Sequence, residues 1–180
     1  MVIPRPESVS ADEAAAIMVA GGTAMIMLKE TARLAPAESV LVEGAGGGVG
    51  TYAIQIAKAL GAGTVVGAAS TPARREAALA VGADHVVDYT AHGWGDELRD
   101  IIGAGVDVVL ESAGGPTTND AFRVLAPFGR MVVYGSASGT PGVLTAVEQH
   151  ALFYEPVLNQ SVTCSPMPAS GRRRSGSGAP

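Results

Sequence analysis

Residues 40–50 read Val-Leu-Val-Glu-Gly-Ala-Gly-Gly-Gly-Val-Gly, a β-branched run that leads into glycines. A helical pattern follows at once, because Val49, Ala53, Ile56 and Leu60 recur at spacings of three and four residues. A strand that passes through glycines directly into an amphipathic helix is the context in which a glycine pattern predicts dinucleotide binding. These residues therefore predict a nucleotide-binding turn between a buried strand and a helix.

The glycines can be assigned separate roles in the pattern Gly-x-Gly-x-x-Gly, in which Ala45 takes the first position. Gly47 would let a pyrophosphate approach the backbone, and Gly50 would let the helix pack closely on the strand. Free amide N–H groups at the start of the helix would then face the phosphates. The alternative is a glycine-rich turn without a ligand. A phosphate-loop NTPase is disfavoured, because no Gly-Lys-Ser/Thr follows.

Short β-branched runs alternate with helical patterns over the rest of the chain. We expect strands at 40–43, 64–68, 85–88, 106–110, 130–134 and, from a weaker pattern, 157–163. We expect helices between them at 48–60, 72–81, 94–102, 117–125 and 145–153. This alternation predicts an α/β fold with a doubly wound parallel sheet of about six strands, which is the Rossmann architecture.

The end of the second expected strand bears on the choice of cofactor. Sites that prefer NAD often place a carboxylate there, about 20 residues after the glycines, to bind the ribose hydroxyls. This strand instead runs into Ser70 without an acid, and Arg74 and Arg75 follow. A hydroxyl and a guanidinium suit a 2′-phosphate, so we predict NADPH as the cofactor. The alternative is that both arginines are solvated residues of a surface helix.

Composition excludes several other classes of protein. The 180 residues are 47% hydrophobic, which is enough to build a core. They include 12 basic and 17 acidic side chains, and this acidic balance makes nucleic-acid binding a poor interpretation. Cys164 is the single cysteine, so a disulfide within the chain or a Cys-x-x-Cys pair is impossible. The histidines His85, His92 and His150 lack metal-ligand spacing, so we predict no metal site.

The two flanks differ from this central pattern. We expect a helical hinge over 1–38, the Rossmann domain over 39–163 and a disordered tail over 164–180. In the hinge, Ser10 is a candidate N-cap with Glu13 at the capping-box position. The apolar run 14–28 is shorter than the roughly 20 residues that span a membrane, so we expect a buried helix of a cytoplasmic protein. The basic tail is either an anion-binding segment or a non-native terminus.

Four ordered stretches resemble the zinc-independent quinone oxidoreductases of the medium-chain dehydrogenase/reductase superfamily. They are residues 44–62, 81–89, 105–115 and 125–135, and the resemblance extends over residues 2–163. Crotonyl-CoA reductases, enoyl reductases and homologues of synaptic vesicle proteins share these motifs. The resemblance is therefore specific for the superfamily and less specific for the substrate.

The resemblance implies hydride transfer from NADPH to a small-molecule quinone or activated alkene (enone). In the family, a Rossmann domain follows a barrel-like catalytic domain, for which we expect no counterpart in this chain. The alternative function is therefore an NADPH-binding module, or an incomplete gene product, that does not turn over. Family members often pair their sheets edge to edge, which predicts a homodimer through the strand near residues 158–163.

The resemblance also implies the positions of the cofactor contacts. Ala45, Gly46, Gly47, Gly48, Val49 and Gly50 would cradle the pyrophosphate, and Ser70 and Arg74 would face the 2′-phosphate. Tyr89 would lie near the adenosine, while Thr23, Ser112, Ala113, Gly114, Tyr134, Gly135 and Ser136 would flank the ribose and nicotinamide. No residue is predicted as a catalytic acid or base, because the cofactor carries the reaction.

Two residues depart from the family pattern. Glu43 stands where many relatives have a histidine, and Glu111 stands where an aspartate is usual. A carboxylate at Glu43, close to bound phosphates, would weaken cofactor binding unless a helix or an arginine offsets its charge.

Overall fold

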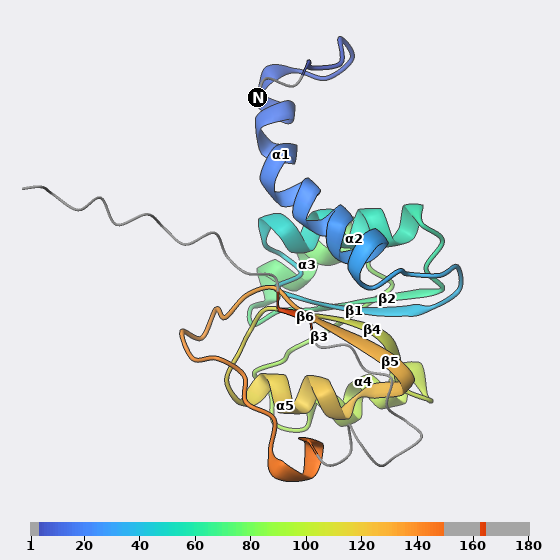
Figure 1. Cartoon of the computed structure of the whole chain (residues 1–180), viewed down its shortest axis with the longest axis vertical. Helices are drawn as coiled ribbons and strands as arrows, with labels where there is room; N and C mark the ends of the chain where they lie inside the picture. The colour runs from blue at the N-terminus through green and yellow to red at the C-terminus, as the bar shows by residue number, and fades with distance from the viewer. Residues whose placement is uncertain (1–3, 150–162, 165–180) are drawn as a thin grey trace, which may run out of the picture.

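The protein is described by a computed structural model that covers residues 4–149 and 163–164 (Figure 1). In this part of the chain, six strands form one parallel sheet in the order β3-β2-β1-β4-β5-β6. The elements are α1 (Ala11–Met25), η1 (Ile26–Thr31), β1 (Ser39–Glu43), α2 (Gly48–Ala59), β2 (Thr64–Ala68), α3 (Pro72–Ala80), β3 (His85–Val87), α4 (Trp94–Ile102), β4 (Val106–Glu111), α5 (Pro116–Arg123), β5 (Leu125–Val133) and β6 (Thr163–Cys164). The strand order changes direction between β1 and β4, which confirms the predicted doubly wound sheet.

Helices cover both faces of the sheet, with α2 and α3 on one face and α4 and α5 on the other (Figure 1). Successive residues of a strand point to opposite faces, so a covered strand supplies both cores. Val40 and Val42 of β1 belong to the core that includes α2, whereas Leu41 belongs to the core that includes α4 and α5. All five residues of β1 are buried, as expected for a strand at the centre of a doubly covered sheet.

One strand begins earlier than its sequence pattern predicts. The expected strand over 130–134 is part of β5, which starts at Leu125. Leu125 pairs with Val106, and the register shifts beyond this pair. The helix expected over 117–125 consequently ends at Arg123. This boundary depends on pairing with another strand, which a local hydrophobic pattern does not contain.

Three predictions lie partly or wholly outside the described residues. Residues 146–149 are helical, and the rest of the helix expected over 145–153 is not described. Of the strand expected over 157–163, the structure describes Thr163, which belongs to β6 and pairs with Val132 of β5. Residues 165–180 of the predicted disordered tail are not described.

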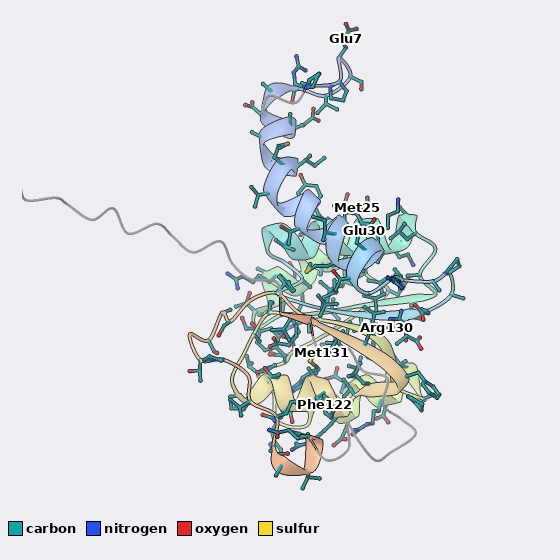
Figure 2. All side chains as sticks on the ribbon, viewed as in Figure 1. Glu7, Met25, Glu30, Phe122, Arg130 and Met131 are labelled. Carbon is teal, nitrogen blue, oxygen red and sulfur yellow. The ribbon has the colours of Figure 1, made fainter. Side chains whose placement is uncertain are left out.

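The N-terminal helix begins where the capping-box pattern predicts. The Glu13 N–H donates to Ser10 Oγ at 3.2 Å, and the Ser10 N–H donates to Glu13 Oε2 at 2.8 Å. α1 then continues into η1, a segment of π-helix. Residues 11–31 thus form one helical segment, which extends away from the body of the domain at its N-terminal end, as the side chains drawn in Figure 2 also show.

The prediction that the apolar run 14–28 is buried is wrong for its first half. Ile17 is 47% exposed and Val19 is 77% exposed, because this part of α1 projects beyond the sheet. Burial starts at Gly21 and continues at Met27 and Leu28, where the helix packs against α2. By length and composition alone, the segment Ala11–Thr31 could cross a membrane, a criterion that core helices of soluble proteins also meet.

Candidate cofactor site

The glycine loop between β1 and α2 is a tight turn that excludes side chains at several positions. Gly44 has a φ of +64°, a conformation that favours glycine. The Gly47 N–H donates to the carbonyl of Gly44 at 2.8 Å and closes the turn. A Cβ atom at Gly50 would lie 2.3 Å from the Gly44 carbonyl oxygen, so only glycine allows α2 to approach the loop this closely.

The start of α2 lacks the side-chain cap that α1 and α3 have, as do the starts of α4 and α5. Ser10 caps α1 and Thr71 caps α3 with their side-chain oxygens. The N-cap of α2 is Gly47, and among the described residues no side chain accepts a hydrogen bond from the N–H groups at this helix start. A helix N-terminus carries unpaired N–H groups and a partial positive charge. The N–H groups of residues 48–50 therefore offer backbone donors to an anion, beside the point where the strand order changes direction.

The loop also abuts the first turn of α3. A Cβ atom at Gly46 would lie 2.6 Å from the Cβ and the carbonyl oxygen of Arg74. Arg74 itself is exposed, and its N–H donates to Thr71 Oγ1 at 3.4 Å. The fold thus brings Arg74 directly against the glycine loop, with Ser70 partly exposed at the end of β2.

Arg74 and Arg75 are adjacent in sequence but have different surroundings. Arg75 Nη1 donates to the carbonyl of Ala69 at 2.9 Å and pairs with Asp88 at 2.8 Å. Arg75 therefore links the ends of β2 and β3, and the idea that both arginines are merely solvated is wrong for this residue. Within residues 4–149 and 163–164, the Arg74 guanidinium has no ion pair or hydrogen bond. Its cation is available to a ligand at the corner next to the loop.

Two turns lie together at the far side of the switch point, after β4 and after β5. The Ala137 N–H donates to the carbonyl of Ser112 at 2.9 Å, and the Ser138 N–H donates to the carbonyl of Ala113 at 2.8 Å. A Cβ atom at Gly135 would lie 3.3 Å from Ser112, so the turns are in close contact. Their residues include Ser112, Ala113, Gly114, Tyr134, Gly135 and Ser136, all predicted as cofactor contacts.

Tyr134 connects these turns to the glycine loop. Its hydroxyl donates to the carbonyl of Glu43 at 2.8 Å. Burial raises the pKa of Tyr134 to about 12, while a hydrogen bond from Ser112 lowers it and the charges of Glu43 and Glu111 raise it further. The phenol consequently keeps its proton and acts as a donor that ties β5 to β1.

The remaining predicted contacts, Thr23 and Tyr89, lie at the two margins of this region. Thr23 is partly buried in α1, one turn after Ala20. A Cβ atom at Gly48 would lie 3.8 Å from Ala20, so this face of α1 borders the glycine loop. Tyr89 follows β3 and packs against the core on the α4 side of the sheet. The structure thus places every predicted residue near a C-terminal strand end or on the neighbouring helix.

A pair of buried glutamates is the feature that the sequence prediction missed. Glu43 ends β1 and Glu111 ends β4, and the two strands pair in register with Val42 opposite Leu110. Both side chains are 0% exposed. Glu43 Oε2 accepts the N–H of Ser112 rather than lying among the phosphate donors. The sequence signal that could have indicated this pair is a glutamate at the C-terminal end of each of two central apolar strands.

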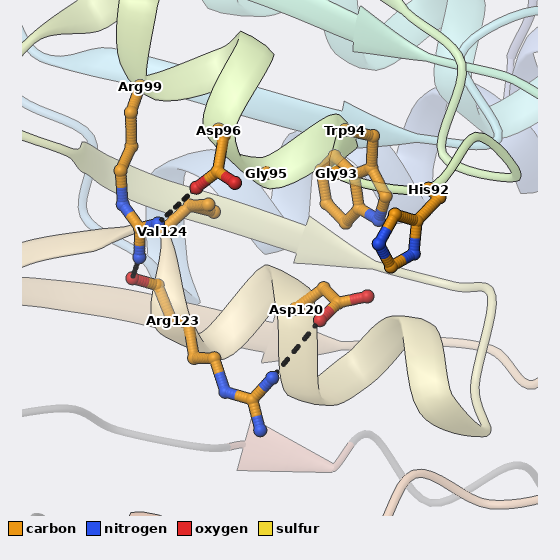
Figure 3. Close-up of a pocket in the computed structure, with 9 residues that line it drawn as sticks. All are labelled: His92, Gly93, Trp94, Gly95, Asp96, Arg99, Asp120, Arg123 and Val124. Carbon is orange, nitrogen blue, oxygen red and sulfur yellow. Dashed lines mark hydrogen bonds and ion pairs between the residues drawn. The ribbon is translucent and has the colours of Figure 1, made fainter.

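A separate cavity of about 270 Å³ lies between α4 and α5 (Figure 3). Arg99 donates to Asp96 at 3.0 Å and to the carbonyl of Arg123 at 2.7 Å, and Arg123 pairs with Asp120 at 3.3 Å. The cavity contains none of the predicted cofactor contacts, and its two arginines are already paired with these acids. The geometry therefore does not favour it as the cofactor site.

Known proteins resemble this chain in both sequence and structure. Residues 48–167 match the family described as zinc-binding dehydrogenase. The chain is 39% identical over 133 residues to the synaptic vesicle membrane protein VAT-1 of Tetronarce californica, covering 74% of this chain and 35% of that protein. It is 35% identical over 150 residues to the 2-haloacrylate reductase of a Burkholderia species, covering 82% of this chain and 45% of that protein.

Solved structures give the same result. The quinone oxidoreductase of Thermus thermophilus, also solved in complex with NADPH, matches with a TM-score of 0.75 and 33% identity. That match covers 92% of this chain and 50% of the other. The chain therefore spans between about a third and a half of the length of these relatives. The matched family is described as zinc-binding, but within the described residues no group of three His, Cys, Asp or Glu side chains could hold a metal ion.

Proposed function

Because this chain belongs to the zinc-binding dehydrogenase family of medium-chain oxidoreductases, we propose that it binds NADPH and supports hydride transfer to a small quinone or activated alkene. The observation that carries this proposal is the uncapped start of α2, which lies behind a glycine loop with Arg74 against it. The residues present fit the cofactor, because the start of α2 offers backbone donors and Gly46, Gly47 and Gly48 carry no side chains in front of them.

The pyrophosphate of NADPH would bind at the start of α2. The amide groups of residues 48–50 would bind its oxygens, and the partial positive charge of α2 favours the anion. Gly46 and Gly47 have no side chains that would fill the approach to the backbone. Glu43 does not oppose this binding as a nearby carboxylate would, since its side chain is buried and burial raises its pKa to about 8.

The 2′-phosphate fits the corner formed by Ser70 and Arg74. Arg74 is exposed beside the loop, whereas Arg75 is occupied by Ala69 and Asp88. The second strand ends in Ala68 and Ala69, so no carboxylate is present there to bind the ribose hydroxyls of NADH. These features support a preference for NADPH over NADH.

The turns at 112–114 and 134–136 would hold the ribose and nicotinamide. NADPH, when bound, supplies the hydride for the reaction. The contribution of this chain is to orient the nicotinamide ring, and the interlocked turns provide a rigid wall for that purpose. Quinones and activated alkenes are proposed as substrates from the Thermus thermophilus quinone oxidoreductase and the 2-haloacrylate reductase.

A binding module without turnover is the second candidate function. The chain spans at most about half of the relatives' length, and the first half of α1 presents apolar residues that nothing in the described structure covers. A steady-state assay of NADPH oxidation with quinones separates the two candidates. Turnover well above the non-enzymatic rate contradicts the binding-only function.

The direct test of the cofactor proposal is a titration of the protein with NADPH and with NADH, followed by nicotinamide fluorescence. We expect Arg74→Ala to weaken NADPH binding by about 10- to 100-fold, the effect of losing one charge-assisted contact, and to leave NADH binding unchanged. Lys58→Ala is the matched control, because it removes one cation at the far end of α2, where Lys58 pairs with Asp84. Equal losses in both variants would contradict the assignment of Arg74.

The homodimer and the cytoplasmic location both stay predictions. A second copy of this chain would pair along the sheet edge at β6, which size-exclusion chromatography tests. Cell fractionation tests the cytoplasmic location.

A further inference from the structure

The C-terminal ends of β1 and β4 hold two carboxyl groups inside the protein. Glu43 and Glu111 are both 0% exposed and lie at adjacent, in-register strand ends. No lysine, arginine or histidine forms a salt bridge with either glutamate in the described part of the chain. Two adjacent buried carboxylates without a cation would be strongly destabilising. The protonation state of the pair therefore has to account for their burial.

One oxygen of each glutamate holds the turn after β4. Glu43 Oε2 accepts the N–H groups of Ser112 at 3.1 Å and Ala113 at 3.0 Å. Glu111 Oε1 accepts the N–H of Gly114 at 2.6 Å and the hydroxyl of Thr118 at 3.0 Å. The N–H groups of Ser112, Ala113 and Gly114 thus all donate to this pair of side chains, and these bonds hold the turn in position.

The other oxygen of each glutamate is buried without a partner in the described residues. These atoms are Glu43 Oε1 and Glu111 Oε2. Buried polar atoms are almost always hydrogen-bonded, and a buried acceptor without a donor is costly. A single proton held between the two carboxyl groups supplies the missing donor for both atoms.

We propose that Glu43 and Glu111 share one proton and that this acid–carboxylate pair positions the 112–114 turn for the nicotinamide half of the cofactor. The positioning part rests on the proposed NADPH function, whereas the shared proton rests on the buried pair alone.

The surroundings of the pair favour one bound proton at neutral pH. Burial raises the pKa of Glu43 to about 8, and the charge of Glu111 and the hydrogen bond between the two side chains act in the same direction. The N–H groups of Ala113 and Ser112 lower the pKa in part. The other titratable groups that face this region are Tyr134, whose pKa is raised to about 12, and Tyr89 beside it. Neither tyrosine introduces a positive charge.

The sign of the pH effect follows from this pKa. The folded protein holds the proton more tightly than the unfolded chain, so the stabilisation is complete below the ordinary glutamate pKa of about 4.5 and decreases as the pH rises through about 8. Loss of the proton leaves two buried carboxylates in contact, which repel each other and displace the turn. We therefore expect both the melting temperature and the NADPH affinity to fall in mildly alkaline solution.

The experiment compares the wild-type protein with Glu43→Gln between about pH 6.5 and about pH 9.5. The glutamine carbonyl replaces Glu43 Oε2 as acceptor, and its amide donates to Glu111 without a titratable proton. We expect the wild-type affinity for NADPH to fall about tenfold over this range and that of Glu43→Gln to stay flat. Infrared spectroscopy at neutral pH is expected to show a protonated carboxylic acid in the wild type that is absent in the variant.

Glu148→Gln is the matched control. Glu148 is also buried, but hydrogen bonds from Thr145 and Asn119 outweigh burial and hold its pKa below the ordinary value. This variant is expected to keep the wild-type alkaline slope and the infrared band. If Glu43→Gln fails to fold, Glu111→Gln makes the converse replacement, with its amide donating to Glu43, and carries the same expectation.

Different results overturn different parts of the proposal. Absence of the protonated-acid band in the wild type, or a melting temperature that does not change up to about pH 9.5, contradicts the shared proton. A present band with pH-independent NADPH binding contradicts the positioning role. A present band and an alkaline slope in stability, without NADPH binding at any pH, contradict the proposed function and leave the shared proton established.

Discussion

At their N-terminal ends β1 and β4 are joined by Ser39 and Asp107, whereas at their C-terminal ends the same two strands carry Glu43 and Glu111. Asp107 Oδ2 accepts both the N–H and the hydroxyl of Ser39 at 2.7 Å, and the Asp107 N–H donates to Ser39 Oγ at 3.0 Å. At the first end, both the N–H and the hydroxyl of Ser39 thus have partners. At the second end each glutamate has an unpartnered oxygen among the described residues.

The ion pair between Arg130 and Glu38 lies beside the N-terminal ends of these strands and adds to the difference between the two ends. Burial alone would raise the pKa of Glu38, but the hydrogen bonds from Arg130 and from the Ala35 N–H keep it below the ordinary value. Arg130 Nη1 donates to Glu38 Oε1 at 2.9 Å. An acid thus meets a base at one end of the sheet, whereas two acids meet at the other. The polar groups at the N-terminal end bond to one another, whereas the C-terminal end leaves the N–H groups at the start of α2 available to a ligand.

The largest expected effect is at the C-terminal end, from Gly50→Ala. Its Cβ atom would lie 2.3 Å from the carbonyl oxygen of Gly44, so the loop and α2 must move apart. We expect a loss of about 3 kcal/mol in the free energy of unfolding, measured by urea denaturation. Gly48→Ala is the control, because its Cβ atom meets only Ala20 at 3.8 Å. Equal stability of the two variants would disprove the close approach.

A smaller effect is expected at the N-terminal end, from Asp107→Ala. The change removes the acceptor of both Ser39 donors in a partly buried place, which costs about 2 kcal/mol of unfolding free energy. NADPH affinity at neutral pH should be unchanged, because the substitution lies at the opposite end of the strands. Asp107→Asn keeps one acceptor and should cost less. A loss of affinity greater than the loss of stability would remove the distinction between the two ends.

The smallest effect is expected from Arg130→Gln, which breaks the pair with Glu38. Both side chains are 22% exposed, so we expect about 1 kcal/mol at neutral pH. Because the pKa of Glu38 is lowered, this stabilisation is present above the ordinary glutamate pKa and is lost as the pH falls through the lowered value. Thermal melts at decreasing pH should therefore bring the variant and the wild type together. A constant difference down to about pH 2 would show that the ion pair is not its source.

Local sequence patterns determine most of the architecture of this protein. The alternation of β-branched runs and amphipathic segments predicts the strands and helices of the sheet within a few residues, because these periods follow from backbone geometry. The capping box at Ser10 and Glu13 and the glycines before α2 are also visible in the sequence, since each acts over a few residues. The family resemblance implies the predicted cofactor contacts, and most of them lie together because parallel strands end at one edge.

Other properties depend on residues that are distant in the chain. Burial of Val19 depends on whether another element covers α1, and the start of β5 depends on its register with β4. Arg74 and Arg75 have the same chemistry and differ because the end of β3 places Asp88 beside only one of them. Glu43 and Glu111 are 68 positions apart, and each considered alone is an acid at the end of an apolar strand, where burial of its charge is unfavourable. Strand pairing makes them neighbours, and burial then makes one proton between them favourable, because charge is costly away from water.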